Sequence, residues 1–215
     1  MQRLIYLLRH GEVDTSSPRR FLGRTDLSLN DNGVRQARAL AGQLQTIPFA
    51  AVVASPLQRA VHTAALVSGR PAAAVRTIDA LAEIDLGLWE GCTVAEVRQR
   101  FPGAYERRGL DLEHVRPEGG ESFGDLADRV CPALFGLIRQ IAGPLLVVAH
   151  AGVNRVLLCR LLCRPVQQVL DLPQDYGAVN ILRTGPQGVE VAAVNLIGPL
   201  PAPDVIATMN QGDRS

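Results

Sequence analysis

Two runs of consecutive apolar residues, each leading into a histidine, constrain the fold of this chain more than any other feature. Leu4–Leu8 leads through Arg9 into His10, and Leu145–Ala149 leads directly into His150. Strands that are buried on both faces of a mostly parallel sheet have such continuous apolar runs, whereas half-exposed strands alternate apolar and polar residues. We therefore expect an α/β fold, a three-layer α/β/α sandwich with helices on both faces of a mostly parallel sheet.

The pattern along the rest of the chain agrees with this fold. Helices are expected where apolar residues recur with helical spacing, and strands where a short apolar run lies between turns. The expected helices are residues 30–45, 56–68, 93–100, 122–141 and 151–162, with a short one near Val166, and the further strands are 49–55, 75–78, 178–183 and 189–195. Pro56 suits the first position of the second helix.

The length of 215 residues and the hydrophobic content of 47% allow one α/β domain with a sizeable core. We predict a single domain over residues 1–197 with a helical cap-like insertion near 92–125. The polar, aperiodic segment 109–120 within it is expected to cover a pocket. Residues 198–215 are expected to form a C-terminal tail that frays.

Composition excludes several function classes. The net charge of +1 gives no general attraction to nucleic acid or to a membrane surface, so neither partner is expected. The chain has no lysine, which excludes a Walker-type phosphate lysine and Schiff-base chemistry. Its first apolar stretch is too short for a signal peptide or a membrane span, which favours a cytoplasmic protein. The four cysteines form no C-x-x-C pair and are expected to be free thiols, with no metal site and no cofactor.

The residues at the strand ends point to a phosphate site. Ligands of open α/β sheets bind beyond the carboxyl ends of the strands, so His10 and His150 are expected to face each other there. Arg9 joins them from the first strand, and Arg59 from the first turn of the helix that follows the strand at 49–55. Glu83 lies among apolar residues near another strand end, where burial would favour its protonated form.

These five residues suit phosphoryl transfer. Arginine offers planar pairs of donors to phosphate oxygens. A neutral imidazole is a nucleophile at neutral pH, so His10 can attack phosphorus and form a phosphohistidine. Arg9, Arg59 and a protonated His150 would neutralise the phosphoryl charge without a metal, while Glu83 would protonate the leaving oxygen and later activate water.

Six segments in order also resemble one known family: LLRHGEVD, FLGRTDLSLNDNGVRQARAL, SPLQRAVHTA, LAEIDLGLWEG, GGESFGDLADRV and LLVVAHAGVNRVLL. They resemble the histidine phosphatase superfamily, the phosphoglycerate-mutase-like enzymes, over nearly the whole chain. The resemblance implies a phosphoglycerate-mutase-like fold, with His10 as nucleophile, Glu83 as proton donor, and Arg9, Arg59 and His150 in the phosphate pocket. The segment LGLWEG resembles the phosphatase branch, and the motifs are most similar to α-ribazole phosphatases and their broad-specificity relatives.

The resemblance also implies which residues bind substrate. Besides Arg9, Arg59 and His150, these are Ser16, Leu22, Gly23 and Ala151. Two of these positions depart from the family pattern: Ser16 stands where the family often has asparagine, and Ala151 where it usually has glycine. If that glycine adopts a positive φ, Ala151 would be strained.

Other residues admit two interpretations. Phe21, Leu22, Trp89 and Tyr105 would either line the leaving-group pocket or belong to the core. His62 is expected on a helix surface or in a packing contact, and His114 in solvent, rather than in the site.

A local basic stretch, formed by Arg107, Arg108 and Arg116, is expected to be a solvated face. The alternative is that these arginines bind a second anionic group of the substrate.

Three functions remain open at this stage. The first is a metal-independent phosphomonoesterase for a small phosphorylated metabolite such as α-ribazole 5′-phosphate. The second is a phosphoglycerate mutase, which the lack of lysine disfavours. The third is a catalytically silent module that binds a phosphorylated ligand. A homodimer paired through an apolar edge strand is a further expectation.

Overall fold

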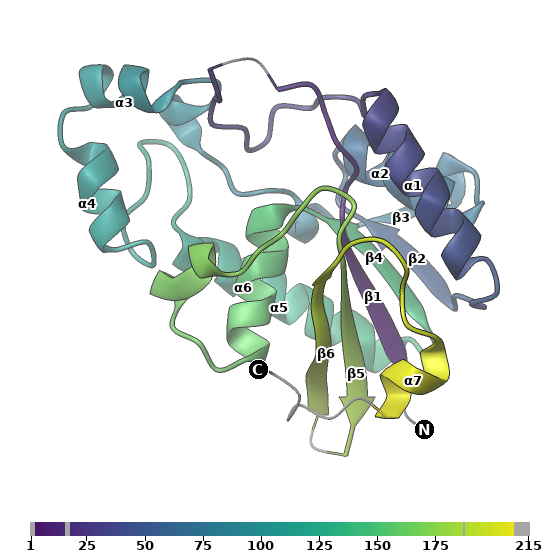
Figure 1. Ribbon diagram of the computed structural model, residues 1–215. Coiled ribbons are helices and arrows are strands. Elements are labelled where there is room, and N and C mark those ends of the chain that lie inside the picture. The colour runs from purple at the N-terminus through teal and green to yellow at the C-terminus, as the bar shows by residue number, and fades with distance from the viewer. Residues whose placement is uncertain (1–2, 16–17, 187, 209–215) are drawn as a thin grey trace.

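The sheet of the molecule has six strands in the order β3, β2, β4, β1, β5, β6 (Figure 1). The structure, a computed structural model, describes residues 3–15, 18–186 and 188–208. The strands are β1 (Leu4–Arg9), β2 (Ala51–Ala54), β3 (Arg76–Thr77), β4 (Leu145–Ala149), β5 (Val179–Gly185) and β6 (Gly188–Leu196). The pairs β1–β4, β2–β4 and β2–β3 are parallel, whereas β5 is antiparallel to β1 and β6. The mostly parallel sheet predicted from the sequence is confirmed.

Helices cover both faces of this sheet because the side chains of its central strands are apolar on both faces. Ile5 and Leu7 of β1 belong to the core cluster under α5 (Phe123–Gln140) and α6 (Ala151–Leu161). Tyr6 and Leu8 belong to the cluster under α1 (Asp31–Leu44) and α2 (Gln58–Ser68). Burying each such side chain contributes roughly 1.5–3 kcal/mol, so the continuous apolar run fixes β1 in the middle of three layers (Figure 1).

Two helix starts show how local capping sets the element bounds. Asn30 caps α1, where its side chain accepts a hydrogen bond from the backbone N–H of Gly33 at 2.8 Å. The expectation that Pro56 opens the second helix is wrong, because α2 begins at Gln58. The strand expected at 75–78 is shorter than predicted, since β3 has two residues.

A pair of short helices lies to one side of the sheet (Figure 1). The first, α3 (Val94–Arg100), begins with a capping box. The second, α4 (Ala104–Leu110), was not predicted. Arg108 of α4 is buried, with its guanidinium 5.1 Å from the ring centre of Phe123, so the solvated face expected there is wrong for this residue.

Short 3₁₀ helices connect the larger elements. They are Ala72–Ala74, Asp79–Leu81, Gly87–Trp89 and Val166–Asp171. The last is the short helix predicted near Val166. The 3₁₀ helix Asp79–Leu81 ends two residues before Glu83.

The segment after β6 is held against the body of the protein, contrary to the expectation that it frays. Gln43 donates a hydrogen bond to the carbonyl of Gly198 and accepts one from the N–H of Leu200. The chain then forms α7 (Pro203–Thr208), from which Ile206 is buried in the core. The rest of the predicted tail, residues 209–215, lies outside the described residues.

Candidate active site

The two histidines lie together because their strands are neighbours. β1 and β4 are parallel, and Arg9 is opposite Ala149 in their register, so His10 and His150 leave the sheet side by side. Their ring centres are 5.1 Å apart, and both side chains are buried. The prediction that they face each other at the carboxyl ends of the strands is confirmed.

The hydrogen bonds of His10 define which nitrogen can react. Its Nδ1 lies 2.7 Å from the carbonyl oxygen of Gly11. Because a carbonyl only accepts, Nδ1 carries the proton and Nε2 has the lone pair, which accepts a hydrogen bond from Nε–H of Arg59. Burial, reinforced by the Arg59 and Arg9 guanidinium groups, lowers the pKa of His10 well below its ordinary value of 6.5. His10 is therefore a neutral imidazole with Nε2 available as nucleophile.

Arg59 points at this nitrogen from the first turn of α2. Its Nε is 3.3 Å from Nε2 of His10, and its two terminal nitrogens donate to the carbonyls of Thr25 at 2.6 Å and Gly23 at 2.7 Å. Gly23, predicted to bind substrate, instead fixes Arg59 through its carbonyl. A Cβ at Gly23 would lie 2.4 Å from the carbonyl oxygen of Ile84, so glycine permits this close approach.

Arg9 is held from the opposite side. Its guanidinium stacks on the Tyr176 ring at 3.6 Å, and one terminal nitrogen donates to the carbonyl of Gln174 at 2.6 Å. Its Nε is buried with no hydrogen-bond partner among the described groups. A buried guanidinium with unused donors is suited to an incoming anion.

His150 lies deeper than the sequence implied. Its Nε2 is 2.6 Å from Ser55 Oγ, and its Nδ1 is buried without a partner in the described structure. Burial, with smaller effects of His10, Arg59 and Arg9, lowers the pKa of His150 well below the ordinary value. The expectation of a protonated His150 is therefore wrong for this structure, because the charges already gathered around it favour the neutral ring.

Glu83 borders the site and contacts α6 through Gly152. Its carboxylate accepts hydrogen bonds from the backbone N–H groups of Ile84 at 2.9 Å and Gly152 at 3.0 Å. A Cβ at Gly152 would lie 2.5 Å from one carboxylate oxygen, so the contact requires glycine there. Ala151, at the start of α6, is not among the residues with positive φ, and the strain considered for it is absent.

A cavity of about 470 Å³ joins these groups except His150, which is fully buried and is not part of its lining. Arg9, His10, Arg59 and Glu83 line it, and of the predicted substrate-binding residues Leu22 and Ala151 do so too. Ser16 lies outside the described residues; its neighbour Thr15 lines the cavity.

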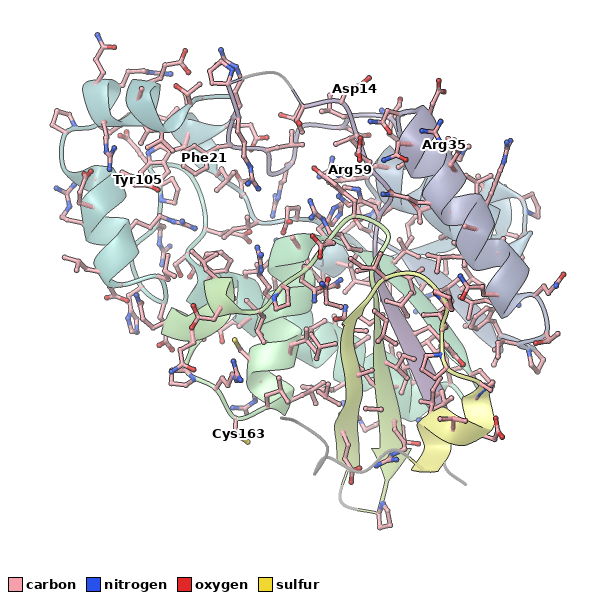
Figure 2. The ribbon with its side chains drawn as sticks, in the orientation of Figure 1. Asp14, Phe21, Arg35, Arg59, Tyr105 and Cys163 are labelled. Atoms are coloured by element: carbon pink, nitrogen blue, oxygen red, sulfur yellow. The ribbon has the colours of Figure 1, made fainter. Side chains whose placement is uncertain are left out.

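The apolar wall of the cavity comes partly from the two helices beside the sheet. Val94 of α3 and Tyr105 of α4 contribute to it with Phe21, which Figure 2 shows near Tyr105. Trp89 is buried behind them, 5.4 Å from Phe21 between ring centres. The expectation that segment 109–120 covers the pocket is wrong, because none of its residues lines the cavity.

The remaining histidines and the cysteines lie away from this cavity. His62 and His114 are exposed, as predicted, and His114 pairs with Asp111. All four cysteines are free thiols, of which Cys163 is exposed. Among the described residues, no group of three or more His, Cys, Asp or Glu side chains is arranged as a metal site. None of the helices in the described ranges combines the length and apolar character that crossing a membrane requires.

Comparison with known proteins agrees with this geometry. The family model described as "Histidine phosphatase superfamily (branch 1)" matches residues 5–197. The chain belongs to the histidine phosphatase superfamily. The predicted family and its phosphoglycerate-mutase-like fold are thereby confirmed.

Individual relatives within the superfamily differ in how much of their length is matched. A bifunctional protein of Mycobacterium tuberculosis is 42% identical over 156 residues, which are 72% of this chain but only 43% of that protein. The glucosyl-3-phosphoglycerate phosphatase of Mycolicibacterium vanbaalenii is 36% identical over 172 residues, 76% of each chain. The solved α-ribazole phosphatase of Shigella flexneri has a TM-score of 0.80 and 27% identity, covering 92% of this chain and all of that one.

Several residues of this histidine phosphatase site were not identified from the sequence. Ser55 and Tyr176 contact His150 and Arg9 from a turn and a loop without periodic pattern. Arg155 also lines the cavity. It lies four residues after Ala151 on α6, so helical spacing from the predicted residue was the signal that could have identified it.

Arg129 of α5 holds the segment that carries Glu83. It donates to the carbonyls of Ala80, Ala82 and Glu83 and pairs with Glu121 at 2.7 Å. Arg129→Met would leave three backbone acceptors without this partner, so we expect a loss of about 3 kcal/mol in unfolding free energy. We also expect a lower kcat, because Glu83 loses its fixed position.

Urea unfolding and phosphatase assays of the same variant measure both effects. Arg139→Met is the matched control, since Arg139 is exposed on the same helix, and it should change stability by less than about 0.5 kcal/mol. An Arg129→Met variant as stable and as active as the wild type would show that the segment keeps its position without the arginine.

The two neutral histidines predict that stability decreases in mild acid. Their folded pKa values lie below 6.5, so between the folded values and 6.5 the unfolded chain binds more protons. Stability therefore falls as pH is lowered through this window, by up to about 1.4 kcal/mol per pH unit for each histidine. The carboxyl groups with lowered pKa contribute only below their ordinary values of 4.5 or less.

Urea unfolding at several pH values between about 5 and 6.5 tests this expectation. In His10→Asn, the slope of the unfolding free energy against pH should be smaller by the contribution of one titrating histidine. A wild-type stability that stays constant over this range would contradict the buried neutral pair.

Proposed function

We propose that this protein is a phosphomonoesterase that hydrolyses a small phosphorylated metabolite through a phosphohistidine at His10, with no requirement for a metal ion. The observation that carries the proposal is the state of His10, a neutral ring with Nδ1–H bound to Gly11 and Nε2 facing Arg59. Glu83 lines the same cavity as this nucleophile and both arginines.

In the first half-reaction, Nε2 of His10 attacks phosphorus while the bond from phosphorus to the ester oxygen breaks. Arg9 and Arg59 neutralise the phosphoryl oxygens, which is the main requirement of phosphoryl transfer. Protonated Glu83 gives its proton to the leaving oxygen, so an alcohol departs and Glu83 becomes a carboxylate.

In the second half-reaction, the Glu83 carboxylate takes a proton from water as the water oxygen attacks phosphorus. The phosphorus–nitrogen bond breaks, inorganic phosphate leaves, and His10 and Glu83 return to their starting protonation states. His150 lies beside His10, with 5.1 Å between the ring centres. We propose that Ser55 donates to Nε2 of His150, which places the proton of the neutral ring on Nδ1 and makes this nitrogen a donor to a phosphoryl oxygen.

The candidate substrate that the sequence offers is α-ribazole 5′-phosphate. The Shigella flexneri relative is named for that substrate class, whereas the Mycolicibacterium vanbaalenii relative is named for glucosyl-3-phosphoglycerate. We propose that α3 and α4 act as a cap that selects the alcohol, because Val94 and Tyr105 line the cavity. A cytoplasmic location, the absence of a nucleic-acid partner and the pairing of two subunits stay predictions.

The test is phosphate release by the purified protein from α-ribazole 5′-phosphate, 3-phosphoglycerate and p-nitrophenyl phosphate, with and without EDTA. We expect release that EDTA does not reduce, together with a phosphoryl adduct on the peptide containing His10 after an alkaline quench. Conversion of 3-phosphoglycerate to its isomer without net release would indicate a mutase instead. No adduct and no release from any ester would indicate a silent binding module.

A further inference from the structure

The cavity extends beyond the groups that handle the transferred phosphate, and two further arginines line that extension. Arg155 reaches it from α6, where Nε donates to the carbonyl of Leu172 at 2.9 Å and fixes the side chain. Its terminal nitrogens have no hydrogen bond within the described structure. Arg19 lines the same cavity and has no hydrogen bond or ion pair with any described residue.

The charges lining the cavity are unbalanced. Five arginines line it, namely Arg9, Arg19, Arg20, Arg59 and Arg155, against a single carboxylate, Glu83. Arg20 is paired with Glu96 outside the cavity at 2.9 Å. Four arginines thus remain. A bound phosphate dianion offsets only two of their charges, and Glu83, which is protonated when the ester binds in the proposed reaction, offsets none.

Arg155 and Arg19 are close enough to affect each other. Burial lowers the pKa of Arg155, Glu83 opposes this effect, Arg19 adds to the lowering, and Asp175 opposes it more weakly. Two guanidinium groups that repel each other across a cavity are stabilised when an anion binds between them.

The position of Arg155 places this second anion on the alcohol side of the phosphate. Glu83 is the strongest attractive charge on Arg155, and Gly152, which binds Glu83, lies three residues earlier on the same helix. In the proposed reaction Glu83 protonates the leaving oxygen. Whatever lies next to Glu83 is therefore the alcohol part of the ester.

We propose that the substrate carries a second acidic group, a carboxylate or another phosphate, which Arg155 binds with the help of Arg19. The inference rests on the proposed phosphatase function and narrows its substrate class. The inference replaces the candidate substrate taken from the sequence: α-ribazole 5′-phosphate, whose alcohol has no second acid, should be a poorer substrate than an acidic ester of similar size.

The experiment compares three esters that differ at one group. Glycerol 3-phosphate has a neutral alcohol, 3-phosphoglycerate has a carboxylate at the same carbon, and glycerol 1,3-bisphosphate has a phosphate there. We expect kcat/KM of the wild type to be at least about tenfold higher for one of the acidic esters than for glycerol 3-phosphate, as a charge-assisted contact provides. Comparison of the two acidic esters distinguishes carboxylate from phosphate.

Variants assign the preference to the arginines. Arg155→Gln should lower kcat/KM for the preferred acidic ester about tenfold more than for glycerol 3-phosphate, and Arg155→Lys, which keeps the charge, should restore part of the difference. Arg19→Gln, at an exposed residue, should reduce the preference by a smaller factor. Arg160→Gln is the matched control, because Arg160 is exposed on the same helix and lies outside the cavity.

Two results would overturn the inference while leaving the phosphatase intact. One is equal kcat/KM of the wild type for all three esters. The other is an equal loss for acidic and neutral esters in Arg155→Gln, which would place Arg155 on the transferred phosphate. A wild type that releases phosphate from none of the esters and forms no adduct would instead refute the proposed function, and this inference with it.

Discussion

His10→Asn is expected to abolish turnover, with a loss of about 10⁴-fold or more in kcat. Asparagine is small enough for the site and keeps a donor for the Gly11 carbonyl, but it has no nitrogen lone pair to attack phosphorus. The other histidine nearby, His150, has its Nε2 bound to Ser55 and does not line the cavity. The phosphoryl adduct should be absent from this variant.

The measurement is kcat with p-nitrophenyl phosphate, joined with mass spectrometry of the quenched protein. His62→Gln is the matched control, because it removes an exposed histidine of α2 that lies one helical turn from Arg59. It should retain wild-type activity. A His10→Asn variant within about tenfold of the wild type would mean that water attacks the ester directly, since a lost nucleophile costs far more.

The central strands and the residues gathered at the candidate site were predictable because each depends on a local pattern. Continuous apolar runs identified β1 and β4, and their parallel pairing then placed His10 and His150 together. Arg59 followed from its position on the first turn of a helix after a strand. These inferences need only the alternation of elements and the rule that ligands bind at the carboxyl ends of strands.

The missed helices have no such pattern. The sequence of α4, AYERRGL, contains a glycine and two adjacent arginines instead of an apolar stripe. Its stability comes from tertiary contacts, among them the burial of Arg108 against Phe123 and Trp89. α7 follows a proline-rich stretch, and Ile206 anchors it in the core cluster.

The error about His150 has an electrostatic cause that no local pattern reveals. From the sequence we expected a protonated His150 beside Arg9 and Arg59. Burial and the charges of these arginines instead favour the neutral ring. The supporting groups Ser55 and Tyr176 were missed for a related reason, since their roles arise from packing between segments far apart in the chain.

Glu83→Gln is expected to lower kcat/KM for alkyl phosphates by about 10²- to 10⁴-fold, the range for loss of a general acid. Glutamine is similar in shape but cannot donate the proton that the leaving alkoxide needs. The p-nitrophenolate group leaves without protonation, so the loss with p-nitrophenyl phosphate should be much smaller. Since the same variant also lacks the base that activates water, the phosphoryl adduct on His10 should accumulate with this ester.

The comparison of the two leaving groups separates proton transfer from positioning. Glutamine has one acceptor oxygen, so it keeps only one of the hydrogen bonds that Glu83 accepts from Ile84 and Gly152. A displaced side chain would lower kcat/KM equally for alkyl and p-nitrophenyl esters, whereas a missing proton affects mainly the alkyl esters. Glu118→Gln, at an exposed glutamate outside the cavity, should change neither. Equal losses of kcat/KM for both esters would therefore show that Glu83 does not transfer the proton and acts only as a positioning residue.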